Sequence, residues 1–462
     1  MGLPELFIKQ IHELLPDIDA KSLIDTLCTS DPSVSVRLNS SKCNDIPTAK
    51  QVNWCKRGYY FDERPQFTFD PALHAGYYYV QDASSMFLSY TIEQLIENTS
   101  PIRYLDLCAA PGGKTTTAID ALPSGSLIVA NEIMPGRAQI LRENIIKWGN
   151  PYCIVSNNDS SVFSNLNHFF DIVATDVPCS GEGMMRKDEE AVTQWSPALV
   201  NECATQQREI VDNAWKCLKP GGFLIYSTCT FNRKENEEII EYMINEFGAE
   251  SIDLKIPKEW NIQCSINSPI HGYHFFPHRT RGEGLFLAVV RKPEEEQYRP
   301  LKSTTKKKGK KESFLAIPEI VKNHVINNKS MTFTSTGDTI NAFPTEYNND
   351  ISILKDYLHI ILSGCDIATI KGKDFIPSHA LALCSQCNKE TFATYEVDYT
   401  TAISYLRGET ITIDAPRGYV LIKYNGMSLG FVKNLGNRAN NLYPKEWRIK
   451  SSHIPSQPPH IL

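Results

Sequence analysis

The sequence contains no apolar run that approaches the roughly 20 residues a helix needs to cross a bilayer. Its N-terminus also lacks the basic, apolar and small-residue pattern of a secretory signal, so we expect a cytoplasmic protein without a membrane anchor. An excess of positive charge is absent too, because the formal net charge is −6. Composition alone therefore does not indicate nucleic-acid binding, which would have to come from local basic patches.

Cysteine is frequent but has no regular spacing. Thirteen cysteines are scattered along 462 residues, and an odd number cannot all pair within one chain. In a reducing compartment, most of them are expected to be small buried apolar side chains. Cys384 and Cys387 have zinc-knuckle spacing, but no second cysteine or histidine pair completes the set, so we predict no metal site.

Strand-like and helical runs alternate in the middle third of the chain, which predicts an α/β domain with a doubly wound, mostly parallel sheet. The strand-like runs are 102–107, 126–131, 152–156, 171–175, 223–227 and 285–291. The helical runs between them are 115–122, 137–148, 199–218 and 235–247.

Residues 105–116 are the stretch around which this domain is organised. A short apolar run ends at Asp106, two glycines follow at Gly112 and Gly113, and a helical pattern begins at Thr115. A strand, tight turn and helix in this order place a small ligand at the carboxyl edge of a parallel sheet. The glycines admit positive φ and let a ligand approach the backbone closely.

Two other interpretations of this turn are open. Residues 113–115 match the end of a nucleoside-triphosphate loop, but that loop requires glycine where this chain has Cys108. Pro111 also removes one backbone N–H from the nest that would hold phosphates. The second alternative is a strand–helix turn that binds no ligand.

Two further motifs each place a cysteine just past an apolar strand. Residues 176–183 read Asp-Val-Pro-Cys-Ser-Gly-Glu-Gly and contain Cys179, while 227–230 read Ser-Thr-Cys-Thr and contain Cys229. Together with residues 106–114, and in this order and spacing, they resemble the RNA 5-methylcytosine methyltransferases of the RsmB/NOP type, which use S-adenosylmethionine. The resemblance runs from about residue 35 to residue 292 and continues more weakly to the end of the chain.

The resemblance implies a Rossmann-like class I methyltransferase fold with a mostly parallel seven-stranded sheet and an antiparallel last strand. It divides the chain into an N-terminal α+β accessory or RNA-binding domain (1–95), a methyltransferase domain (96–293), a lysine-rich linker (294–313) and a C-terminal region (314–462) that ends in a β-rich, PUA-like RNA-binding module. Six lysines lie between Lys302 and Lys311, a run that is typical of a solvated segment or of a phosphate-binding one.

Carried over by motif, the resemblance assigns S-adenosylmethionine to the glycine turn and to acidic residues that follow successive strands. Glu132 would accept the ribose hydroxyls and Asp159 would reach the adenine edge. Each has a structural alternative, since Glu132 could cap a helix and Asp159 could form an Asx turn. The expected binding set is Cys108, Ala109, Ala110, Pro111, Gly112, Gly113, Lys114, Glu132, Asp159 and Asp176.

The resemblance also assigns the chemistry. Cys229 is the expected nucleophile toward carbon 6 of cytosine, and Cys179 is expected to assist proton loss and product release. Asp176 would contact the cytosine amino group and ring nitrogen, with Lys114 as a nearby cation. The residues alone would leave the two cysteines interchangeable, and we expect Cys108 to be structural.

The implied partner is ribosomal RNA, or the small ribosomal subunit, bound by a monomer. The same chemistry on tRNA or on large-subunit RNA, and a noncatalytic assembly factor on this fold, are the alternatives. Arg37 and Asn39, on a strand-like run, are candidates for RNA or interdomain contact. Further basic candidates for RNA contact near loop ends are Arg137, Arg186, Lys187, Arg279 and Arg281.

Overall fold

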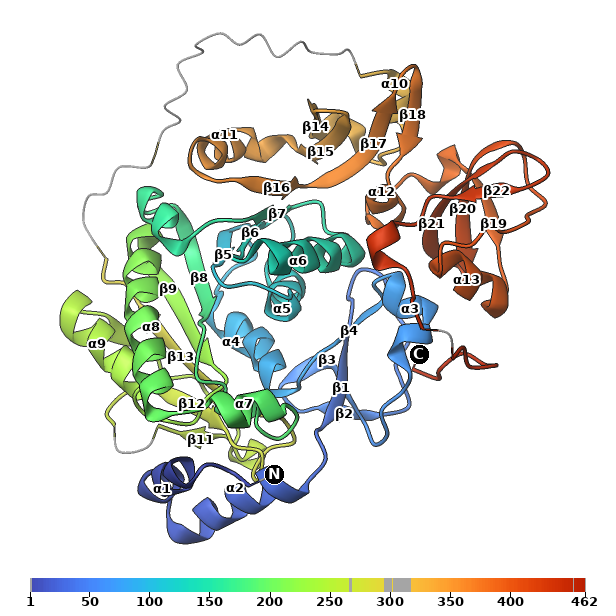
Figure 1. The fold of residues 1–462 in the computed structure, drawn as a ribbon. Helices are drawn as coiled ribbons and strands as arrows, with labels where there is room; N and C mark the ends of the chain where they lie inside the picture. The colour runs from blue at the N-terminus through green and yellow to red at the C-terminus, as the bar shows by residue number, and fades with distance from the viewer. Residues whose placement is uncertain (1, 266–267, 295–300, 302–316, 452, 462) are drawn as a thin grey trace.

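The computed structural model describes residues 2–265, 268–294, 301, 317–451 and 453–461. Within this part of the chain, its largest element is a sheet of ten strands in the order β11-β12-β13-β9-β8-β5-β6-β7-β16, with β10 paired to β13 (Figure 1). The strands are β5 (Arg103–Asp106), β6 (Leu127–Asn131), β7 (Cys153–Ser156), β8 (Phe170–Asp176), β9 (Leu218–Thr228), β10 (Glu250–Ser251), β11 (Gln263–Cys264), β12 (Gly272–Phe275), β13 (Leu285–Arg291) and β16 (Ile360–Ser363).

All six predicted strands are present, and β5 to β9 are parallel neighbours. Strand β13 runs antiparallel beside β9, as the resemblance implied. The Rossmann-like fold is thus confirmed, but the sheet has ten strands where seven were expected. The four strands that the sequence did not indicate, β10, β11, β12 and β16, have two to four residues each, too few to show the alternation by which a strand is predicted.

Helices cover both faces of the sheet because neighbouring residues of each strand point to opposite sides. Tyr104 of β5 packs in one buried cluster with α4, α5 and α6, whereas Leu105 packs in another with α8 and α9. The helices are α4 (Phe87–Leu95), α5 (Gly113–Ala121), α6 (Pro135–Trp148), α7 (Glu189–Gln194), α8 (Pro197–Cys217) and α9 (Glu237–Phe247).

The N-terminal residues form two helices and a small sheet that packs beside the large one (Figure 1). The strand order is β2-β3-β1-β4, and short helix α3 follows a loop after β3. The elements are α1 (Glu5–Leu14), α2 (Asp17–Thr29), β1 (Val34–Leu38), β2 (Lys50–Val52), β3 (Cys55–Phe61), α3 (Pro71–His74) and β4 (Tyr78–Val80).

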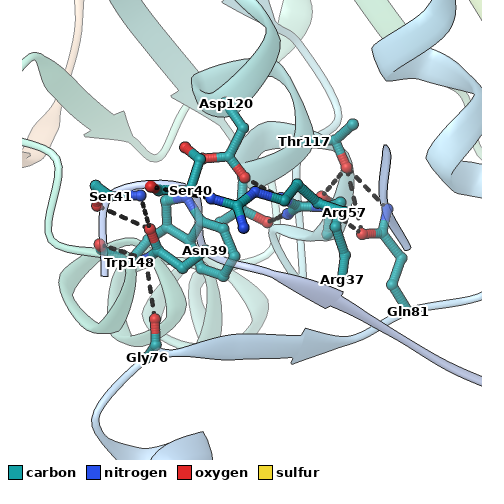
Figure 2. Close-up of polar contacts among 12 residues, drawn as sticks. Arg37, Asn39, Ser40, Ser41, Arg57, Gly76, Gln81, Thr117, Asp120 and Trp148 are labelled. Carbon is teal, nitrogen blue, oxygen red and sulfur yellow. Dashed lines mark hydrogen bonds and ion pairs between the residues drawn. The ribbon is translucent and has the colours of Figure 1, made fainter. Parts of the chain in front are cut away.

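A buried arginine connects this small sheet to the helices of the large one (Figure 2). The Arg37 side chain is 1% exposed, donates to Thr116 Oγ1 at 2.6 Å, and forms an ion pair with Asp120 of α5. The Asn39 side chain donates to the backbone carbonyls of Gly76 and Trp148. The interdomain alternative for these two residues is therefore confirmed, and their burial leaves no surface for RNA.

The C-terminal residues add two four-stranded sheets, in the orders β14-β15-β17-β18 and β19-β20-β21-β22. Asn425 and Gly426 both have positive φ between β20 and β21 and form the Asn-Gly turn of a β-hairpin. The elements are α10 (Glu319–Lys322), β14 (Met331–Thr336), β15 (Thr339–Pro344), α11 (Asn348–Tyr357), β17 (Cys365–Lys371), β18 (Asp374–Pro377), α12 (His379–Leu383), β19 (Ala393–Glu396), α13 (Tyr399–Leu406), β20 (Gly418–Tyr424), β21 (Met427–Asn434) and β22 (Ala439–Asn441).

Strand β16 follows the predicted linker in the chain, yet it pairs antiparallel with β7. The large sheet therefore contains strands from both the predicted methyltransferase domain and the predicted C-terminal region. The lysine run itself lies outside the described residues. Among the residues that the structure describes, no helix is both long and apolar enough to cross a membrane.

Candidate active site

The carboxyl ends of β5, β8 and β9 meet at one edge of the large sheet, and each is followed by one of the three predicted motifs. The first loop leads through the glycines into α5, the second carries Cys179 and the third carries Cys229. Parallel strands that are neighbours in the sheet bring their ends together, so motifs far apart in sequence form one site.

The glycine turn has the backbone geometry that its sequence predicts. Gly112 has φ 112°, a region that glycine adopts without strain, and α5 begins at the next residue. Two side chains of α6 hold the turn from outside, since Arg137 donates to the carbonyl of Ala110 and Asn144 to that of Pro111, both at 2.8 Å. The turn therefore presents the N-terminus of α5 at the sheet edge.

The two acids assigned to the cofactor both make local hydrogen bonds. Glu132 is buried and accepts from the backbone N–H of Met134 at 2.9 Å, in a local turn before α6. Asp159 accepts from the N–H and the hydroxyl of Ser161, and these hydrogen bonds lower the pKa of Asp159. The Asx turn predicted as the alternative for Asp159 is thus present, and the roles of both acids toward a cofactor remain predictions.

An ion pair links the glycine turn to the end of β8. Lys114 Nζ lies 2.8 Å from Asp176 Oδ2, while Ser227 Oγ donates to Asp176 Oδ1 at 2.8 Å. Burial is the largest influence and lowers the pKa of Lys114, but the charge and hydrogen bond of Asp176, together with the smaller effects of Cys229 and Asp106, make the net shift upward. Lys114 therefore carries a positive charge at neutral pH. The structure brings these two predicted residues together.

The two predicted cysteines are also brought together. Cys179 Sγ and Cys229 Sγ lie 3.2 Å apart, within hydrogen-bond distance for thiol groups. The hydrogen bond with Cys229, and next burial, raise the pKa of Cys179 well above its ordinary value. Either sulfur can donate at this distance, so the geometry places the two residues in one site and their division of labour remains a prediction.

Cys108 differs from this pair. Its sulfur accepts a hydrogen bond from Thr175 Oγ1 at 3.6 Å, and burial raises the pKa of its thiol to about 12. A thiol that is protonated at neutral pH is a poor nucleophile, in line with the structural role predicted for it.

Sequence reasoning did not single out three buried acids near the site. Asp106 accepts from Thr115 Oγ1 at 2.6 Å, and burial raises its pKa to about 7. Glu182 and Glu235 lie in the two cysteine loops and are both 0% exposed. The sequence signal for these acids was that each lies within or beside a motif. A buried carboxylate needs several hydrogen-bond donors, and such groups are frequent at functional sites.

The basic residues predicted to contact RNA are mostly engaged in ion pairs. Arg186 pairs with Glu283 at 2.7 Å and is almost fully buried. Arg279 pairs with Asp19, and Arg281 pairs with the exposed Asp62. Their role toward RNA remains a prediction.

A metal site is not evident in the described part of the chain, where no group of three His, Cys, Asp or Glu side chains could hold an ion. Cys384 and Cys387 are both buried there, and Cys384 Sγ accepts from the N–H of Gln386 at 3.5 Å.

Three family models match the chain in succession. They describe the N-terminal domain of 16S rRNA methyltransferase RsmF (residues 3–83), 16S rRNA methyltransferase RsmB/F (residues 94–291) and the methyltransferase RsmF PUA domain (residues 392–449). The middle match contains the glycine turn and both cysteines, and the last contains the Asn-Gly hairpin.

Full-length relatives align with almost the whole of this chain. Ribosomal RNA small subunit methyltransferase F of Enterobacter sp. (strain 638) is 29% identical over 96% of this chain and 95% of its own. The protein of the same name from Vibrio cholerae (strain M66-2) is 29% identical over 96% and 98%.

Solved structures support the fold. A methyltransferase homologue from Pyrococcus horikoshii has a TM-score of 0.54 and 25% identity over 63% of this chain and 96% of that one. NSun6 from the same organism has a TM-score of 0.54 and 18% identity over 63% and 99%. The three models in their order, together with relatives of matching length, show that the chain belongs to the RsmB/F family of 16S rRNA methyltransferases.

Proposed function

We propose that this protein transfers a methyl group from S-adenosylmethionine to carbon 5 of a cytosine in 16S rRNA through a covalent cysteine–cytosine adduct. The observation that carries the proposal is the pair of sulfur atoms of Cys179 and Cys229, 3.2 Å apart, at the sheet edge that also holds Lys114 and Asp176. The names of the full-length relatives support small-subunit RNA as the substrate.

The residues present suit the methyl donor. Gly112 gives the turn room for the methionine end, Glu132 is placed after β6 for the ribose hydroxyls, and Asp159 follows β7 for the adenine amino group. When bound, S-adenosylmethionine supplies an electrophilic methyl group on a sulfonium.

The chain must activate cytosine, because carbon 5 of a neutral ring is a poor nucleophile. In this proposal the Cys229 thiolate forms a bond to carbon 6, and the electron pair of the C5–C6 double bond makes carbon 5 nucleophilic. Asp176 contacts the cytosine amino group and ring nitrogen, and the Lys114 cation balances the negative charge that develops on the ring. A thiolate suits the first step because it is a strong nucleophile and also a good leaving group.

Release needs a second group. Once carbon 5 carries the methyl group, the carbon 6–sulfur bond breaks and its electron pair returns to the sulfur of Cys229, which takes the proton of the Cys179 thiol 3.2 Å away. The Cys179 thiolate left behind accepts the proton of carbon 5, whose bonding electrons restore the C5–C6 double bond, and a thiol with a raised pKa gives a strong base for this step. A stacked cytosine cannot be reached from its ring face, so the target base is single-stranded or flipped out.

Two single substitutions test the proposal. Cys229→Ala should reduce methylation at least about 1,000-fold while S-adenosylmethionine still binds. Cys179→Ala should instead accumulate a covalent protein–RNA adduct, visible as a band that resists denaturation on a gel. Incorporation of labelled methyl groups into total rRNA is the activity readout. Normal turnover by both variants would refute the mechanism.

The RNA target needs its own test. Bisulfite sequencing of RNA from a strain that lacks the gene should show one or more cytosines in 16S rRNA that lose the modification. Loss confined to tRNA or to large-subunit RNA would move the same chemistry to another substrate. An unchanged map, with no methyl transfer to total rRNA, would favour a noncatalytic assembly factor.

A further inference from the structure

Each of the two cysteine loops carries one fully buried carboxylate. Glu182 follows Cys179 by three residues, and Glu235 follows Cys229 by six. Both acids are 0% exposed. A carboxylate is removed from water at a large cost unless hydrogen bonds replace its hydration, so a fully buried one is kept in place by its donors.

Glu182 accepts hydrogen bonds from the other cysteine loop as well as from Gln10 of α1 at 2.7 Å and from Trp195 at 3.1 Å. From that loop, its Oε2 accepts from the backbone N–H groups of Phe231 at 2.7 Å and Asn232 at 3.0 Å, two and three residues after Cys229. Backbone donors fix the path of the main chain rather than one side chain, and hydrogen bonds to a charged acceptor are the strong ones. Glu182, from the Cys179 loop, thus holds the Cys229 loop.

The donors to Glu235 come from the Cys179 loop. Its Oε2 accepts from the backbone N–H of Ser180 at 2.9 Å, and its Oε1 accepts from the Ser180 hydroxyl at 2.5 Å. Gln207 of α8 adds a donor at 2.9 Å. Glu235, from the Cys229 loop, thus holds the residue next to Cys179.

Asn232 and Gly183 make further contacts between the two cysteine loops. The Asn232 side-chain amide donates to Glu182 Oε1 at 3.0 Å and to Glu235 Oε1 at 2.7 Å, so it bridges the two carboxylates. The N–H of Gly183 donates directly to the carbonyl of Cys229 at 2.7 Å. The two loops are therefore held reciprocally, each by an acid of the other.

We propose that Glu182 and Glu235 are positioning residues of this reaction: a reciprocal carboxylate clamp that sets the distance between the two catalytic sulfur atoms. The inference rests on the proposed function, because it assigns each acid to one step of that chemistry. Glu182 orients Cys229 for attack on carbon 6. Glu235 orients Cys179 for release of the product. Neither carboxylate touches the reacting atoms in this assignment.

The clamp predicts opposite kinetic defects for two isosteric substitutions. Glu235→Gln replaces an acceptor that faces the Ser180 N–H with an amide, which frees the Cys179 loop and slows release. It should accumulate the covalent RNA adduct while lowering turnover about 100-fold, the effect of a displacement of about 1 Å at a catalytic group. Glu182→Gln should slow adduct formation by a similar factor without accumulation.

The experiment follows the denaturation-resistant adduct over time in the full-length protein with rRNA and S-adenosylmethionine. Binding of S-adenosylmethionine and the far-ultraviolet circular dichroism spectrum show that each variant is folded. Glu246→Gln, on an exposed position of α9, is the matched control and should behave like the unmodified protein. If Glu235→Gln does not fold, Ser180→Ala removes one donor of the same contact and should show a weaker accumulation.

The Cys179→Ala variant separates failure of the clamp from failure of the proposed function. If that variant forms the adduct and Glu235→Gln turns over like Glu246→Gln, the clamp is refuted and the chemistry stands. The clamp is also refuted if Glu182→Gln and Glu235→Gln share one defect, because a merely structural role would affect both steps alike. Absence of any adduct in Cys179→Ala overturns the covalent mechanism and the clamp with it.

Discussion

Arg37→Met should destabilise the protein strongly although Arg37 lies outside the catalytic loops. Its guanidinium is 1% exposed, pairs with Asp120, donates to Gln81 and Thr116, and stacks over the Trp148 ring at 4.6 Å. Methionine fills much of the volume but leaves the Asp120 carboxylate buried without its cation. Removal of one partner from a buried pair costs about 3–5 kcal/mol.

The free energy of unfolding is measured by urea titration, and the melting temperature should fall by roughly 3–5 °C. The double variant Arg37→Met with Asp120→Asn removes the uncompensated charge as well. It should therefore recover part of the loss and lie closer to the unmodified protein than Arg37→Met does. A cost below about 1 kcal/mol for Arg37→Met, or additive losses in the double variant, would refute the reasoning.

The same variant has a pH signature. Burial raises the pKa of Asp120 even with Arg37 present, and the charge of Arg37 lowers it. Without that charge the folded pKa rises further. A raised folded pKa gives stability that is present at low pH and lost as pH rises through the folded value. The stability difference between Arg37→Met and the unmodified protein should therefore grow from pH 5 to pH 8.

Two other substitutions test the site by different readouts. Burial raises the pKa of Asp106 to about 7, so the ligand-free protein should lose stability, on the order of a few kcal/mol, as pH rises from about 4 through 7. Asp106→Asn should flatten that dependence in melting curves, and an unchanged slope would contradict the assigned burial. A Cβ added at Gly183 would lie 2.9 Å from the carbonyl oxygen of Cys229. The same Cβ would lie 3.0 Å from the carbonyl oxygen of Glu283. Gly183→Ala should lower methyl transfer about 10-fold while S-adenosylmethionine affinity is kept, because the displacement falls on the cysteine loops and on the segment before β13, away from the glycine turn. Weakened cofactor binding would place the damage elsewhere.

The arrangement of the site could be predicted because its motifs follow strands. Asp106, Cys179 and Cys229 are each at or just past the end of a run whose apolar residues identify a buried parallel strand. Parallel topology then brings those ends to one edge without any knowledge of side-chain contacts. The topology and the resemblance together predicted that both cysteines belong to one site, and the structure places their sulfur atoms 3.2 Å apart.

Contacts between loops could not be predicted. Glu182 stands between two glycines, and Glu235 stands among charged residues, so each has the local pattern of an exposed turn or helix start. Their burial depends on donors about fifty residues away in the chain, and no local pattern encodes that. For Arg37 the sequence left RNA contact and interdomain contact both open, because its partners Thr116 and Asp120 lie about eighty residues away in the chain.

Strand β16 has a consequence for biosynthesis. Until residues 360–363 leave the ribosome, β7 remains an open border of the catalytic sheet, with unpaired backbone groups that can recruit a strand from another nascent chain. Strand β16, from the C-terminal half of the chain, pairs with this edge and covers it. Folding of the catalytic sheet is therefore completed by a strand that is synthesised after all of its other strands.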